Sequence, residues 1–254
     1  MTMAVRKGLE LRRSSRARCF SIAALLLFAT AGCSKLEEED TAAEVDPTIV
    51  SSLFAEGFEG GSPASEARSE ERAATAGDVQ DLRAGIPFDR SRSLTGRVEQ
   101  AAAKELDKLF SLRFALADPG DFVSSGKVRD VWERELAARG YSGDTLAGAT
   151  ALMFGVAWEL ANGRKLSAAD HAAILRQVTS KLRGDPLERQ GDEQRQIQAD
   201  IRLITAGLWL EEAYLREPYP DQMRELSDAV QRDMQKMTKN DMRATRVTAE
   251  GFSD

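Results

Sequence analysis

From residue 93 to about residue 240, hydrophobic residues recur with a period near 3.6, the spacing that places them on one face of a helix. Gly, Pro, Asn and Asp residues separate six such segments and are typical of helix ends. We expect helices over about residues 94–116, 127–138, 145–162, 168–182, 193–216 and 221–238. No segment with period-2 alternation competes. The predicted fold is therefore all-α, a compact bundle of about six helices over residues 93–240, followed by a C-terminal tail at residues 241–254.

The third predicted helix is apolar almost all round, which predicts that it lies at the centre of the bundle. Asp144 is expected to cap its start, and Asn162-Gly163 ends it. Glu159 and the high content of glycine and alanine argue against a membrane-spanning role for this segment. The fourth helix is expected to begin at Ser167 with an arrangement close to a capping box.

The first 32 residues have the three parts of a bacterial signal peptide. Six basic residues are followed by an apolar run from Phe20 to Ala29, and small residues then precede Cys33. The apolar run is about half of the ~20 residues that a helix needs to cross a bilayer. Residues 1–32 are therefore predicted to direct export and to take no part in the fold.

Residues 30–33, Thr-Ala-Gly-Cys, resemble the lipobox of bacterial lipoproteins, in which the cysteine receives a lipid before cleavage. The resemblance implies a membrane anchor at Cys33, although Thr30 stands where that family usually has leucine. Ser34 is not the aspartate that retains lipoproteins in the inner membrane, so the resemblance implies an outer-membrane lipoprotein that faces the periplasm or is surface-exposed. Alternatively, residues 29–31 fit the A-x-A pattern of ordinary signal peptidase, which leaves Cys33 unmodified.

Residues 33–92 are interpreted as an acidic, disordered tether. Twelve acidic residues against three basic ones give residues 34–80 a net charge of −9, and such a segment cannot bury enough apolar surface to offset its chain entropy. One apolar patch breaks the pattern, and it is either a helix that docks on a partner or on the domain itself, or a nascent helix that packs nowhere in particular. Its members recur at helical spacing: Ile49, Val50, Leu53, Phe54 and Phe58.

Charge and composition exclude several classes of function. The whole chain has a formal charge of −6, and without the signal, at +5, it carries −11, which argues against nucleic-acid binding through a basic face. After export, Cys33 is the single thiol, so no internal disulfide is expected. His171 is the single histidine, so neither a zinc site of His and Cys ligands nor any other metal or cofactor is predicted. We expect His171 to be packed or half-exposed rather than a general base.

Residues 124–127 match the S-x-x-K motif, but the companion S-D-N and K-T-G motifs are missing, as are the strands of that enzyme fold. Glu159, next to Trp158, is the one candidate for a catalytic acid, since some glycan-cleaving enzymes use a glutamate. The favoured alternative is that Glu159 lies on the solvent-facing end of its helix. Trp158 and Trp209 are weak binding candidates. Trp132 and Trp209 are likewise followed by acids that are expected to point outward: Glu133, Glu211 and Glu212.

Three runs, AWELANG at residues 157–163, EQRQ at 193–196 and MRATRVTAEGF at 242–252, resemble in this order a family of exported bacterial proteins catalogued only as a domain of unknown function. The resemblance covers roughly residues 88–252. It implies an exported helical domain and carries no activity to transfer. The family has acidic and aromatic residues in the helix before the tryptophan where this chain has Gly148, Thr150 and Met153.

Three hypotheses for function follow. The preferred one is a lipid-anchored envelope protein without a catalytic site, whose helical domain binds an envelope protein or glycan through a helix groove or an exposed apolar patch. The second is a cell-wall hydrolase or lyase that uses Glu159 as its acid. The third is a carrier whose helices enclose a lipid-like ligand.

Overall fold

The computed structural model describes residues 85–183 and 185–253, and in this part of the chain the predicted all-α class is confirmed. The predicted signal peptide, Cys33 and the apolar patch at residues 49–58 lie outside the described residues. The described residues form seven α-helices, one 3-10 helix and one small hairpin. They are α3 (Arg92–Leu109), α4 (Pro119–Ser124), α5 (Lys127–Arg139), α6 (Leu146–Asn162), α7 (Ala168–Leu182), η1 (Pro186–Arg189), α8 (Asp192–Arg216), α9 (Pro220–Thr238), β1 (Arg246–Thr248) and β2 (Gly251–Ser253).

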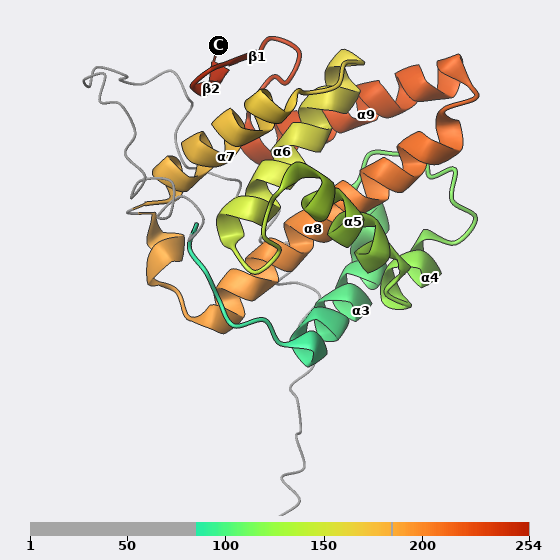
Figure 1. The fold of residues 1–254 in the computed structure, drawn as a ribbon. Helices are drawn as coiled ribbons and strands as arrows, with labels where there is room; N and C mark the ends of the chain where they lie inside the picture. Colours follow the sequence, from blue (N-terminus) through green and yellow to red (C-terminus); the bar gives the residue numbers. More distant parts are fainter. Residues whose placement is uncertain (1–84, 184, 254) are drawn as a thin grey trace, which may run out of the picture. The chain divides into compact units, whose positions relative to one another are not determined.

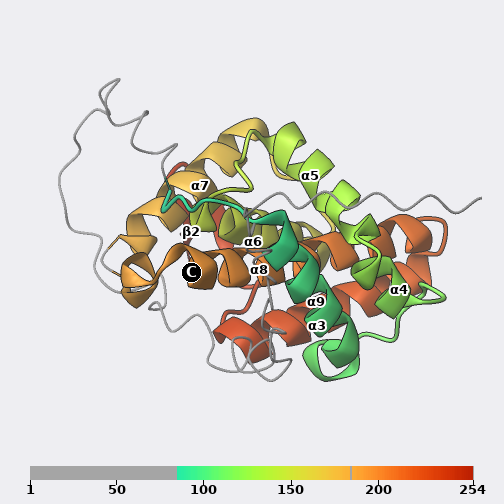
Figure 2. The same cartoon turned by 90° about the horizontal axis from the view of Figure 1, so that it is seen from below.

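Helices α6 and α8 form the centre of the fold (Figures 1 and 2). They pack on each other; α6 also contacts α7 and α9, while α8 also contacts α3, α5 and α9. Every residue of α6 from Leu146 to Glu159 is buried, as expected for a helix that is apolar all round. The prediction of a central third helix is therefore confirmed. Among the described helices, none is both long and apolar enough to cross a membrane.

The first predicted helix ends earlier than expected. Helix α3 stops at Leu109, whereas the pattern predicts a helix to Leu116, so that prediction is wrong. Buried carboxylates of α9 and α8 hold the chain that follows: Asp233 Oδ1 accepts a hydrogen bond from Ser111 N at 2.9 Å, and Glu212 accepts hydrogen bonds from the backbone N–H groups of Ala115 and Leu116 at 2.8–3.0 Å. These bonds hold a non-helical segment, after which Asp118 caps the additional short helix α4.

The predicted helix starts are partly correct. Ser167 and Asp170 form the expected capping box at α7, with Asp170 N donating to Ser167 Oγ at 3.2 Å and Ser167 N donating to Asp170 Oδ2 at 2.9 Å. Helix α6 is capped by Thr145, whose hydroxyl accepts from Gly148 N at 3.0 Å. Asp144, the predicted cap, instead pairs with Arg90 at 2.9 Å, because Arg90 offers it a charged partner.

Residues 85–92, which the sequence analysis assigns to the tether, belong to the described fold. Ile86 and Phe88 are buried, and their segment runs beside the start of α6. Leu146 N donates to the Ile86 carbonyl at 3.1 Å, and Phe88 N donates to the Asp144 carbonyl at 3.1 Å. Burial of these two apolar side chains explains why the segment before α3 packs against the helices.

The C-terminal residues, assigned above to a tail, also pack onto the helices. Residues 246–253 form an antiparallel hairpin that period-2 analysis did not reveal, because its strands have three residues each. Trp158 Nε1 donates to the Thr245 carbonyl at 2.9 Å. The side-chain amide of Gln177 on α7 binds both the N–H and the carbonyl of Phe252, at 2.8 and 2.6 Å, and so takes the place of a third strand.

Candidate functional site

Glu159 lies near the C-terminal end of α6, yet only 5% of its surface is exposed. Three donors hold its carboxylate: Arg139 Nη2 and Lys165 Nζ each lie 3.3 Å from Oε2, and Leu166 N lies 3.0 Å from Oε1. Gly163 adopts the left-handed conformation (φ 60°) that turns the chain back over this end of the helix. The expectation that Glu159 faces solvent is therefore wrong, because the returning loop covers it.

His171 and Tyr141 extend this ionic cluster into the interior. The Tyr141 hydroxyl lies 3.2 Å from His171 Nδ1 and 3.0 Å from the His171 carbonyl oxygen. His171 Nε2 lies 3.8 Å from Glu159 Oε1. Burial lowers the pKa of His171, and the nearby Arg139 lowers that pKa further, against the opposing effect of Glu159. Burial raises the pKa of Tyr141, so both rings are neutral near pH 7.

Arg139 is the buried cation that balances the cluster. Its side chain is only 7% exposed, and its Nη2 binds Glu135 at 3.1 Å as well as Glu159. Its Nε and Nη1 atoms are buried without a hydrogen-bond partner in the structure. Gly155 lies beside this guanidinium, and a Cβ built there would be in ordinary van der Waals contact with Arg139 Nη1, at 3.7 Å. The cluster thus joins α5, α6 and the loop after α6 by a balanced set of charges, with the neutral His171 of α7 beside them.

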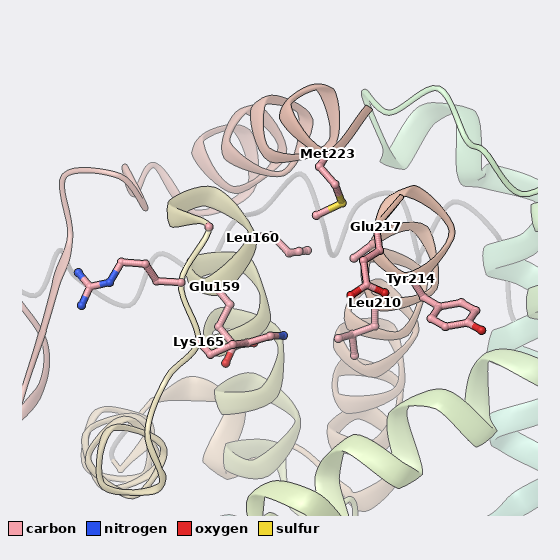
Figure 3. A pocket seen from close by; sticks show the side chains of 10 residues that line it. Glu159, Leu160, Lys165, Leu210, Tyr214, Glu217 and Met223 are labelled. Atoms are coloured by element: carbon pink, nitrogen blue, oxygen red, sulfur yellow. The ribbon is translucent and has the colours of Figure 1, made fainter. Parts of the chain in front are cut away.

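A groove of about 350 Å³ opens beside the cluster, where the end of α6 meets the end of α8 and the start of α9 (Figure 3). We call it the α6–α8–α9 groove. Its apolar lining comes from all three helices: Leu160, Leu210, Ala213 and Met223. Its polar lining lies around this apolar part: Glu159, Gly163, Arg164, Lys165, Tyr214 and Glu217. Figure 3 shows Leu160 and Met223 directed toward the space between the helices, and Tyr214 turned outward.

Two tyrosines mark the same corner of the molecule. Tyr214 is 71% exposed and Tyr219 is 54% exposed, and among the described residues these are the large hydrophobic side chains left in solvent. Exposed aromatic side chains beside an apolar depression are typical of binding surfaces rather than of bare protein surface. This corner is therefore the strongest candidate for a functional site.

Comparison of the chain with protein-family models, with curated proteins and with solved structures gave no match. The chemistry of the groove must accordingly be inferred from its own residues.

The other candidates from the sequence serve the core or the surface. Trp158 is 6% exposed, and Arg164 covers its ring at 5.7 Å from the ring centre, so it borders the site without lining the groove. Trp209 is fully buried against Phe110 and is not available to a ligand. Lys127 of the S-x-x-K match pairs with Asp121 at 2.8 Å on the surface.

The acids that follow the three tryptophans do not all point outward. Glu133 is exposed as expected, but Glu212 is completely buried and pairs with Arg216 at 3.0 Å. The spacing of these two residues, four apart on one helix, is the signal that could have revealed the pair. Within residues 85–183 and 185–253, no three His, Cys, Asp or Glu side chains come together in a way that could hold a metal ion.

A second set of buried charges holds α3 against α8 and α5. Asp200, 1% exposed, pairs with Arg90 and accepts a 2.8 Å hydrogen bond from the Thr95 hydroxyl. Glu99, 2% exposed, pairs with Arg129 of α5. Burial raises the pKa of both carboxyl groups, and the arginines oppose this effect. These pairs lie away from the groove lining, and their geometry serves helix packing.

Sequence reasoning missed most of the groove. It named Glu159 as a site residue but assigned none of the apolar lining residues to a site, because each lies at the margin of an apolar face and is only partly buried: Leu160, Leu210, Ala213 and Met223. Tyr214 carried a usable signal: it lies on a predicted helix away from the apolar face, where an aromatic residue is unusual.

Proposed function

We propose that this chain is a lipid-anchored protein of the bacterial cell envelope, whose helical domain binds another envelope protein in the α6–α8–α9 groove. The observation that carries the proposal is the apolar lining of the groove beside Tyr214 and Tyr219, on a domain whose other large hydrophobic side chains in the described residues are covered. The N-terminal signal and Cys33 support the anchored location.

The size and lining of the groove favour apolar side chains of a protein segment. A cavity of about 150 Å³ holds one benzene ring, so the 350 Å³ groove has space for about two side chains of that size. Leu160, Leu210 and Met223 supply flexible apolar contacts, and methionine adapts to different shapes. The charged rim gives orientation to the bound segment, as the polar rim does at other protein interfaces.

Site-specific cross-linking in intact cells tests the proposal. A photoreactive residue at position 214 is expected to capture a specific envelope protein, and Ala213→Trp, which fills the groove, is expected to abolish that capture. A photoreactive residue at the exposed position 133 on α5 serves as the control. Capture from both positions alike, or capture that survives Ala213→Trp, contradicts the proposal. Glycan fragments cross-linked at position 214 would instead identify a glycan ligand.

The anchor has its own test. We expect Cys33→Ser to move the protein from the membrane fraction to the soluble fraction and to remove the lipid mass from its processed N-terminus. If neither the fractionation nor the processed mass changes, the ordinary signal-peptidase alternative is supported and the lipid anchor is rejected.

A cell-wall hydrolase or lyase is the second candidate, and one observation favours it: Glu159 and Glu217 both line the groove. The three donors on the Glu159 carboxylate argue against it, since a general acid must present a proton to its substrate. Incubating the full chain with peptidoglycan decides between the two. Our proposal expects no released fragments, whereas fragments that disappear with Glu159→Gln would establish the enzyme.

A further inference from the structure

We propose that residues 49–58 of the same chain occupy the α6–α8–α9 groove in the free protein and are displaced when the partner binds. The inference rests on the proposed function and adds a regulation to it. Three properties of the chain carry it: the apolar match between segment and groove, the length of the connecting chain, and the distribution of charge.

The apolar match is between the aromatic side chains of residues 49–58 and the apolar lining of the groove. Between residues 34 and 84, the two aromatic residues are Phe54 and Phe58, and they stand in the one apolar patch of this segment. Residues four apart lie on the same face of a helix, so a helix over this segment would present the two rings together. The groove has room for about two such rings among Leu160, Leu210 and Met223.

The connecting chain has a suitable length. The Gly85 carbonyl accepts a hydrogen bond from Ala147 N at 3.1 Å, which places residue 85 at the start of α6. Leu160 lies 13 residues further along this helix, at about 20 Å from Ala147. A coil of about 27 residues, the number from Phe58 to Gly85, has an end-to-end distance of roughly 30 Å. A linker that matches its span gives an effective concentration on the order of millimolar.

The distribution of charge determines how the segment is oriented in the groove. Residues 44–59 contain four acidic residues and no basic one. At one end of the groove, Arg164 and Lys165 are both exposed, the side chain of Lys165 by 81%. Lys165 and Arg139 both pair with Glu159, so this end of the groove keeps a net positive charge, and Glu217 follows the last residue of α8 on the other side of the groove. The acidic flanks of the segment are thus attracted toward the loop at residues 164–165 and repelled from Glu217.

A segment bound in this way makes the groove selective. A partner has to displace residues 49–58 from the groove. Its apparent affinity is therefore its intrinsic affinity multiplied by the fraction of molecules in which the groove is free. Weak or incidental apolar ligands are then excluded, while a partner with a closer fit still binds.

The first experiment maps the occupant by cross-linking. The full chain with a photoreactive residue at position 214 is purified from detergent-solubilised membranes, without its partner, and is then irradiated and digested. We expect a cross-link within one chain, from position 214 to the peptide that contains residues 49–58, and its loss in the double variant Leu53→Asp, Phe54→Asp. The photoreactive residue at position 133 is expected to give no such cross-link. A cross-link to another segment, to a second copy or to a lipid overturns the inference, as does the absence of any cross-link from position 214 within the chain.

The second experiment measures competition. A fluorescent peptide of residues 45–60 is added to isolated membranes that carry the full chain. We expect it to bind the Leu53→Asp, Phe54→Asp variant about tenfold more tightly than the unchanged chain, and Ala213→Trp to remove this binding. Equal binding to both chains overturns the inference. If the peptide behaves as expected but no partner is captured from position 214 in cells, the proposed function fails while the docking of residues 49–58 stands.

Discussion

Glu159 and Arg139 depend on each other, because each is a buried charge that the other compensates. Arg139 keeps Glu135 as a second partner, but Glu135 is more exposed, with 26% of its side chain in solvent. A pair of this kind is costly to break, although it adds little to stability relative to a well-packed apolar pair. The groove rim is fixed by the same contacts, since Lys165 is held by Glu159.

We predict that Glu159→Leu lowers the free energy of unfolding of the full chain by about 3 kcal/mol, because it leaves the Arg139 guanidinium buried with one carboxylate fewer. Glu133→Leu is the matched control. It also follows a buried tryptophan in a helix but is exposed, so a change within about 0.5 kcal/mol is expected. Urea unfolding at neutral pH measures both, and equal effects would show that the buried pair is not what distinguishes the two glutamates.

The second residue-scale prediction concerns His171, the one histidine of the chain. Because its folded pKa lies below the unfolded value of about 6.5, the unfolded chain takes up a proton first as the pH falls. Its contribution to stability is therefore present above about pH 6.5 and is lost toward the lowered folded pKa. The loss is at most about 1.4 kcal/mol per pH unit.

Unfolding measured at about pH 7.5 and pH 5.5 checks this prediction. We expect His171→Gln to lose less stability on acidification than the unchanged chain, since glutamine keeps a partner for the Tyr141 hydroxyl but does not titrate. Burial raises the pKa of Asp200, so its contribution to the free energy of unfolding increases as the pH falls, opposite to that of His171. This contribution is the same in both proteins and cancels in the comparison. If both proteins lose the same free energy of unfolding between pH 7.5 and pH 5.5, His171 is not the group responsible for the loss.

At the scale of elements, the contact between α5 and α8 depends on a residue without a side chain. Gly207 sits in the interior of α8, where glycine is normally unfavourable by about 1 kcal/mol relative to alanine. A Cβ at this position would lie 2.8 Å from Val128 Cγ2 and 3.1 Å from the Val128 carbonyl oxygen. Glycine is present here in spite of its low helix propensity, because Val128 of α5 occupies the space that a Cβ would need.

Two glycine-to-alanine changes are therefore predicted to change the free energy of unfolding in opposite directions. Gly96→Ala, in α3 with no atom within 4 Å of the added Cβ, is expected to stabilise the protein by about 0.5–1 kcal/mol. Gly207→Ala is expected to destabilise it by about 1–3 kcal/mol, because overpacking against Val128 outweighs the gain in helix propensity. Thermal unfolding of the two variants checks the pair. Stabilisation by Gly207→Ala would mean that α5 and α8 can separate at little cost.

At the scale of the whole molecule, the two ends of the described chain close the bundle. The segment at residues 85–91 covers the start of α6, and the hairpin at residues 246–253 covers α7. Phe252 packs beside Phe154 of α6, with ring centres 6.3 Å apart. The helical core is thus completed by residues that have no helical pattern of their own.

We predict that Phe252→Ala destabilises the whole domain by about 2–4 kcal/mol, since the ring is 8% exposed and belongs to the common core. Glu250→Ala, two residues away and exposed, serves as the control and is expected to change stability by less than about 0.5 kcal/mol. Native-state hydrogen exchange distinguishes global from local loss. If only the amides of the hairpin lose protection, the C-terminal residues are an appendage rather than part of the core.

The sequence alone determined what depends on near neighbours. The helical periodicity, the capping box at Ser167, the glycine at the end of α6 and the apolar character of its central segment all act within a few residues. Each contributes free energy in any surroundings, so the all-α class and most helix limits could be predicted. The same local information placed Glu159 next to Trp158 and identified it as the acid to examine.

Only the tertiary structure decided which side chains meet. Whether Glu159 faces water or an arginine depends on a residue 20 positions earlier and on a loop that folds back over the helix. The non-helical segment after α3 is held by Asp233 and Glu212, roughly a hundred residues away, and the groove is formed by residues of three helices that meet at one corner. Such contacts cannot be predicted from the periodicity of the sequence. A buried polar group is favourable only when its partner, which is distant in the sequence, lies beside it in the fold.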